Sequence, residues 1–227
     1  MIALLDAARR VAAPRVPHEI LAPTTLMIPD RARVGILAAR GSGKSVIARL
    51  LAGIDPPDEG QVLRQGRVSW PVGFAGALHP DLTVADNIAL IAGLLGEDAA
   101  DLTAFCDLVG GLGALFDQPM KRATPAQRAA LGWCLSLGVA CDTYIADDTI
   151  GFGLNRQRAM SEMLLSQRLE TAGLVFLSSN PQQIGRFCDR FYVLLGGRMM
   201  PCDDLRAGQE ALEAMSYPTE GDADDEQ

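Results

Sequence analysis

Apolar positions along the chain follow two spacings, one typical of helices and one typical of buried strands. Over 44–52 the apolar side chains recur at helical spacing and the run stops at Gly53, which predicts a helix. The predicted strands cover 24–28, 33–37, 143–146, 174–177, 191–195 and 198–200, and the predicted helices cover 44–52, 83–95, 101–109, 124–139, 155–172, a segment from 181 and 203–215. Because strands alternate with helices, the expected class is α/β, with a mainly parallel sheet and an antiparallel hairpin at its edge.

The two ends and one internal stretch depart from this alternation. Residues 1–20 predict a short amphipathic helix followed by a proline-containing arm. The stretch 61–80 is expected to be poor in strands and rich in turns. The acidic tail, 217–227, is expected to be disordered. One domain over 21–216, with a helical subdomain at about 81–140, is expected to account for the rest.

Composition narrows the class of protein. The chain has 227 residues, of which 48% are hydrophobic, so it can bury a sizeable core. Its formal net charge of −8 argues against a general nucleic-acid binder, because such binding depends on an excess of Lys and Arg. No run of about 20 apolar residues predicts a membrane span. The five cysteines and two histidines lack zinc-ligand spacing, so no zinc site is expected.

A glycine-rich loop between a predicted strand and a predicted helix carries the most informative chemistry. It consists of Ala38, Ala39, Arg40, Gly41, Ser42, Gly43, Lys44 and Ser45. Glycines let successive N–H groups turn inward around phosphates, a lysine reaches the β- and γ-phosphates, and a serine hydroxyl coordinates Mg²⁺. The N-terminus of the following helix also favours an anion. The pattern therefore predicts a nucleotide phosphate site, with Ala38 in place of the usual first glycine.

Two consecutive carboxylates, Asp147 and Asp148, follow the predicted strand 143–146. A phosphate loop needs a second Mg²⁺ partner on a neighbouring strand, and Asp147 fits that role. Asp148 then lies at the place of a catalytic base. Two solvated carboxylates at a strand end are the alternative, but their combination with Lys44 favours the metal role.

The chain resembles the nucleotide-binding subunits of ABC transporters, in particular the ATPases of capsular polysaccharide and O-antigen exporters. The resemblance covers most of residues 20–202, with the motifs in the family's order. These motifs are the phosphate loop within 33–45, the turn over 50–60, the stretch 68–87 with its Ser-Trp-Pro, Gly-Phe and Leu-Thr, the segment after Tyr144, and the closing strand within 187–195. The stretch 68–87 resembles the polysaccharide branch most specifically.

This resemblance implies a phosphate-loop NTPase of ABC type that binds ATP and Mg²⁺. It implies that two nucleotide-binding subunits, in a homodimer or a heterodimer, sandwich ATP head to tail. Each site then combines the phosphate loop of one subunit with the signature motif of the other. The resemblance also implies a membrane-subunit partner at the cytoplasmic face of the inner membrane. Polysaccharide export would be driven there by ATP-dependent dimerisation and hydrolysis.

The signature motif departs from the family pattern. It aligns with Thr124-Pro-Ala-Gln127, so Thr124 and Gln127 are candidate ATP contacts. Thr124 retains a hydroxyl group for the γ-phosphate. Pro125 has no N–H to donate, and Ala126 adds a methyl group where a backbone approaches the nucleotide.

The catalytic positions also depart from the pattern. The general-base glutamate aligns with Asp148, whose side chain is one methylene shorter, and the switch histidine aligns with Ser179. No glutamine occurs within 68–77 to contact Mg²⁺ and the attacking water. A misplacement of about 1 Å can cost about 100-fold in rate, so we expect ATP binding to be better preserved than hydrolysis.

Two rival functions are considered. A catalytically degenerate nucleotide-binding module that regulates or scaffolds a membrane complex would explain Ala126, Asp148 and Ser179. A soluble phosphate-loop kinase would need an acceptor pocket and usually an arginine-rich lid. The lid region lacks such an arginine cluster, and the helix from Thr124 leading to Asp148 fits an ABC subunit better.

Overall fold

The computed structural model describes residues 1–12 and 18–216. The predicted acidic tail and most of the predicted proline-containing arm lie outside these ranges. Within them, no helix has both the length and the apolar character needed to cross a bilayer.

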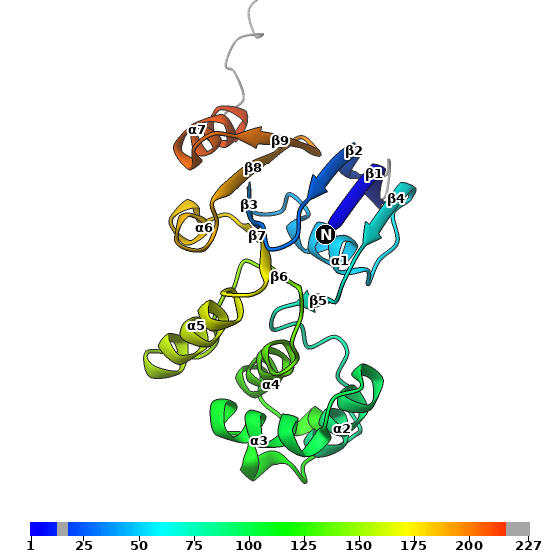
Figure 1. The fold of residues 1–227 in the computed structure, drawn as a ribbon, viewed down its shortest axis with the longest axis vertical. Coiled ribbons are helices and arrows are strands. Elements are labelled where there is room, and N and C mark those ends of the chain that lie inside the picture. Colours follow the sequence, from blue (N-terminus) through cyan, green and yellow to red (C-terminus); the bar gives the residue numbers. More distant parts are fainter. Residues whose placement is uncertain (13–17, 217–227) are drawn as a thin grey trace, which may run out of the picture.

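A six-stranded sheet forms the centre of the molecule, with strand order β5-β6-β7-β3-β8-β9 (Figure 1). Its strands are β3 (Arg33–Ala38), β5 (Val68–Pro71), β6 (Thr143–Asp147), β7 (Gly173–Ser178), β8 (Arg190–Leu195) and β9 (Arg198–Cys202). All neighbours pair in parallel except β8 and β9, which form an antiparallel hairpin. The predicted α/β class and its antiparallel edge are confirmed.

Helices cover both faces of this sheet. Side chains of β6 alternate, so that Ile145 packs with α1 (Lys44–Ala52) while Tyr144 packs in the core that contains α6 (Pro181–Phe187). The helix α7 (Leu205–Ser216) packs beside α6 against β3 and β8. Figure 1 shows α1 and α6 on opposite sides of the central strands.

A second, antiparallel sheet has the order β2-β1-β4 and covers α1 from outside. It contains β1 (Ile2–Val11), β2 (His18–Ile28) and β4 (Glu59–Arg64). The predicted N-terminal helix is therefore wrong. The register of β1 shifts twice near Ala7, and Asp6 adopts a φ of 47°. These bulges break the strict alternation, so the apolar residues of the strand fall at a helix-like spacing.

The stretch 61–80 also contains more strand than expected, since it holds most of β4 and all of β5. β5 is short, and Pro71 lies at its end on the edge of the large sheet. Proline has no N–H for a ladder and is tolerated at such an edge. The turn-like composition therefore obscured a genuine edge strand.

A helical region extends from the end of β5. It contains α2 (Val84–Leu95), α3 (Ala99–Gly110), the short helices η1 (Gly113–Leu115) and η2 (Met120–Arg122), and α4 (Pro125–Gly138). Figure 1 shows these elements in green, at the end of the molecule opposite β8 and β9. The helix α5 (Arg156–Arg168) contacts α3 and α4, and its Leu165 lies in the same buried cluster as Leu174 and Phe176 of β7.

Candidate functional site

The glycine-rich loop joins the end of β3 to the start of α1. The Ser42 N–H and hydroxyl group both donate to the Ala39 carbonyl, at 3.4 Å and 2.8 Å, and close a tight turn. Gly41 and Gly43 have φ values of 79° and 89°, which favour glycine. A Cβ at Gly43 would lie 2.4 Å from Ile20 Cγ2, so a side chain is also excluded there by contact. Both glycines are therefore required by geometry.

The departure at Ala38 lies in the strand rather than in the turn. Ala38 is the last residue of β3, is fully buried, and pairs with Leu194 of β8. Its methyl group therefore packs into the core. The turn that follows is formed by Ala39, Arg40, Gly41 and Ser42, and α1 then presents its first-turn N–H groups to the same space.

Lys44 is held inside this loop. Its side chain is only 5% exposed, and Nζ donates to the Ala39 carbonyl at 3.0 Å. The same atom lies 3.4 Å from Asp148 Oδ2. An ammonium group in this position is fixed by the loop and is electrostatically balanced by one carboxylate. An incoming phosphate would replace that carboxylate as its partner.

Asp147 ends β6 and lies in register with Leu177 of the neighbouring parallel strand β7. Its Oδ1 is buried and has no hydrogen-bond partner among the described residues. Burial raises the pKa of Asp147 above its usual range, while the Ser45 side chain and Lys44 oppose that shift. A buried, unsatisfied carboxylate oxygen near a serine hydroxyl fits the hard oxygen set that Mg²⁺ prefers.

Replacing Asp147 by asparagine is expected to stabilise the protein without ligand. With a raised pKa, folded Asp147 keeps a proton that the unfolded chain has released, so stability falls as pH rises from 3.8 through that raised pKa. Asp147→Asn removes this loss. We expect its melting temperature to exceed that of the wild type at about pH 7 by at most about 2–4 °C, with a smaller difference near about pH 4.

Differential scanning fluorimetry over this pH range measures the effect. The exposed Asp117→Asn is the matched control and should follow the wild type at each pH. An Asp147→Asn variant that melts below the wild type at neutral pH would contradict the inference that burial of the ionised Asp147 side chain destabilises the folded protein.

Asp148 and Ser179 lie together at the ends of β6 and β7. Asp148 has a φ of 54°, and its N–H donates to the Leu177 carbonyl at 2.8 Å. The Ser179 N–H donates to Asp148 Oδ1 at 3.1 Å, while Lys44 approaches Oδ2. Both carboxylate oxygens are thus positioned by neighbours. The serine backbone, rather than its hydroxyl group, makes this contact.

These residues border one cavity of about 630 Å³. Its lining residues are Arg40, Gly41, Gly43, Lys44, Ser45, Val46, Asp148, Ser178, Ser179, Asn180 and Gln183. Sequence analysis missed Gln183, which reaches the cavity from the first turn of α6. The helix start at Asn180-Pro181, directly after Ser179, is the signal that could have identified it.

Thr124 and Gln127 are not part of this cavity. They cap α4, where the Thr124 N–H donates to Gln127 Oε1 at 2.8 Å and the Gln127 N–H donates to Thr124 Oγ1 at 3.3 Å. In this reciprocal capping box both side chains accept through an oxygen, so it does not use the Thr124 O–H or the Gln127 side-chain N–H groups. Within one chain, the structure therefore does not bring the predicted signature residues to the phosphate loop.

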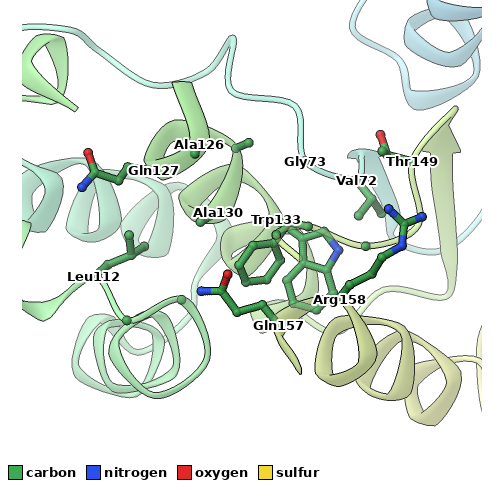
Figure 2. A pocket seen from close by; sticks show the side chains of 16 residues that line it. Val72, Gly73, Leu112, Ala126, Gln127, Ala130, Trp133, Thr149, Gln157 and Arg158 are labelled. Carbon is green, nitrogen blue, oxygen red and sulfur yellow. The ribbon is translucent and has the colours of Figure 1, made fainter. Parts of the chain in front are cut away.

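Gln127 instead borders a second cavity of about 440 Å³ between α4 and the loop after β6. Figure 2 shows Trp133 and Gln157 close to each other in the middle of the view, with Gln127 farther toward the left; all three line the cavity. The Trp133 ring lies 5.1 Å from the Phe152 ring, and its N–H donates to the Ile150 carbonyl at 3.3 Å. Sequence analysis missed this hollow, which only the packing of distant segments creates.

Comparisons with known proteins agree on one family. No family model matches the chain. The capsule polysaccharide export ATP-binding protein CtrD of Neisseria meningitidis is 30% identical over 183 residues, covering 81% of this chain and 85% of that protein. ATP-binding protein BexA of Haemophilus influenzae is 32% identical over 173 residues, covering 76% and 80%. The polysialic acid transport ATP-binding protein KpsT of Escherichia coli is 29% identical, covering 83% and 85%.

Solved structures identify the same fold. A dimer of the ATP-binding cassette MJ0796 in a post-hydrolysis state, bound to ADP and phosphate, superposes with a TM-score of 0.72 at 18% identity. The match covers 88% of this chain and 96% of that one. A second dimeric structure of the same ABC transporter cassette gives a TM-score of 0.70.

Proposed function

The chain belongs to the family of ATP-binding proteins of polysaccharide exporters, and from this premise we propose that it powers export of a capsular or other cell-surface polysaccharide. It does so as the ATP-hydrolysing subunit of an ABC exporter. The similarity to named export proteins favours this function over a degenerate regulatory module.

One observation carries the proposal: Lys44 of the loop and the carboxylates Asp147 and Asp148 lie together at the ends of β3, β6 and β7. Lys44 and Asp148 are in ionic contact, and Asp147 Oδ1 is buried without a partner among the described residues. Open α/β sheets place ligands at this edge. Ser45 and Asp147 would hold Mg²⁺, which supplies positive charge to the β- and γ-phosphates when bound.

The residues of the chain have distinct roles in this proposal. The N–H groups of the loop and of the first turn of α1 bind phosphate oxygens. When ATP binds, Lys44 gives up its ion pair with Asp148 and contacts the phosphates instead. The freed Asp148 carboxylate, still oriented by the Ser179 N–H, accepts a proton from the attacking water. The proposal therefore places ATP binding and proton acceptance in one cavity.

The position of the signature motif supports a composite site. Thr124 and Gln127 lie outside the phosphate cavity of their own chain. A second nucleotide-binding subunit, identical or different, would supply its own signature motif in a head-to-tail dimer. The proposed complex also contains a membrane subunit, which would hold the ATPase peripherally at the cytoplasmic face of the inner membrane.

Lengthening the general base tests the catalytic part of the proposal. In Asp148→Glu the carboxylate reaches one methylene further, and we expect phosphate release from Mg-ATP to rise by about tenfold or more, since positioning errors of about 1 Å cost about 100-fold. Asp148→Asn should lose turnover but retain ATP binding. Steady-state phosphate release and equilibrium ATP binding are measured on the same samples, with the exposed Asp117→Glu as the control.

Equal turnover in all the Asp148 variants would refute its role as the base. ATP binding without turnover in any variant would instead identify a binding module. Transfer of labelled phosphate to a small acceptor would support a kinase.

A further inference from the structure

The tip of the phosphate loop carries a cation that the motif does not require. Arg40 occupies the second position of the turn over 39–42, directly before Gly41 with its positive φ. Its side chain is exposed and borders the phosphate cavity. Neither the turn nor the cradle of backbone N–H groups needs an arginine at this position.

The charges around the cavity are distributed unequally. Its charged lining residues are Arg40, Lys44 and Asp148. Lys44 is committed to the Ala39 carbonyl and to Asp148, at 3.0 Å and 3.4 Å. Across residues 1–12 and 18–216, Arg40 makes no side-chain hydrogen bond or ion pair. Among the described residues, the cavity therefore has one cation that is already paired, the buried Lys44, and one that is available, the exposed Arg40.

The other side of the cavity is weak in positive charge. Ser178, Ser179, Asn180 and Gln183 line it without a cationic side chain. The backbone N–H of Ser179 is already used by Asp148 at 3.1 Å. These four residues would therefore offer no cationic side chain to the negatively charged terminal phosphate of a bound nucleoside triphosphate.

We propose that Arg40 is a specificity-determining residue whose guanidinium binds the terminal phosphate, so that the site discriminates triphosphate from diphosphate. This inference rests on the proposed ATP site and adds a side chain that makes affinity depend on the presence of a third phosphate. A guanidinium presents several N–H donors in a planar fork that matches phosphate oxygens, and it stays charged at every working pH. Arg40 thus supplies a charge that serine at position 179 does not.

Competition binding with base-free phosphates tests this directly. Labelled ATP is displaced from the wild type, Arg40→Gln and Arg40→Lys by ATP, ADP, tripolyphosphate and pyrophosphate, each with Mg²⁺. We expect Arg40→Gln to weaken the binding of ATP and tripolyphosphate by about tenfold, which is the scale of one charge-assisted contact. The binding of ADP and pyrophosphate should weaken by less than about threefold. Arg40→Lys should recover part of the loss, and the ATP affinity of Arg40→Gln should depend less on salt.

Arg198→Gln is the matched control, because it removes another exposed arginine, from β9, outside the cavity. Unchanged ATP affinity in Arg40→Gln would overturn the inference while leaving the proposed ATP site intact. An equal loss for ATP and ADP would also overturn it, since Arg40 would then contact the base or the inner phosphates. A wild type that binds no ATP would overturn both proposals.

Discussion

Replacing Lys44 by alanine is expected to weaken ATP binding by about 100-fold, which corresponds to about 2.8 kcal/mol. Two effects add. The ammonium group that would contact the phosphates is lost, and Asp148 is left in the cavity without the countercharge 3.4 Å away. A carboxylate without its cation repels the triphosphate. Equilibrium binding of ATP with and without Mg²⁺ measures the loss.

Lys121→Ala is the matched control for this change. Lys121 also forms an ion pair, 2.9 Å from Asp81, but both side chains are exposed and lie outside the phosphate cavity. Exposed pairs contribute at most about 1 kcal/mol to stability, so this variant should fold and bind ATP like the wild type. The double variant Lys44→Ala/Asp148→Asn should recover part of the affinity. If it does not, repulsion by Asp148 is not part of the loss.

Replacing Trp133 by alanine is expected to lower the free energy of unfolding by about 3–5 kcal/mol. Trp133 is 2% exposed, packs on Phe152 and donates a hydrogen bond to the Ile150 carbonyl. It therefore joins α4 to the loop that begins at Asp148. Urea unfolding followed by circular dichroism measures the loss.

Leu108→Ala is the control for the truncation, because Leu108 is 84% exposed on α3 and should change stability by less than about 0.5 kcal/mol. Trp133→Phe keeps a ring against Phe152 and should retain most of the stability. A loss below about 1 kcal/mol in Trp133→Ala would mean that the hollow beside Trp133 collapses freely. The helical region would then be less tightly coupled to the loop that begins at Asp148 than its contacts indicate.

Local chemistry made several elements predictable. The helix α1 follows from the spacing of its apolar residues and from the glycines at its two ends, and both bounds agree with the structure. The start of α4 follows from the capping box of Thr124 and Gln127. These signals are readable because the interacting groups lie within one helical turn. The strand β1 was not predicted, because its partners lie in distant segments and its bulges disturb the alternation.

The same distinction applies to the site. The sequence by itself was enough to predict a phosphate loop and two adjacent carboxylates, because glycine, lysine, serine and aspartate carry that chemistry at fixed spacing. Only the tertiary structure decided that Lys44 contacts Asp148, that Asp147 Oδ1 is buried without a partner among the described residues, and that Arg40 is available at the cavity mouth. Those facts depend on the parallel pairing of β3, β6 and β7, which brings together residues far apart in the chain.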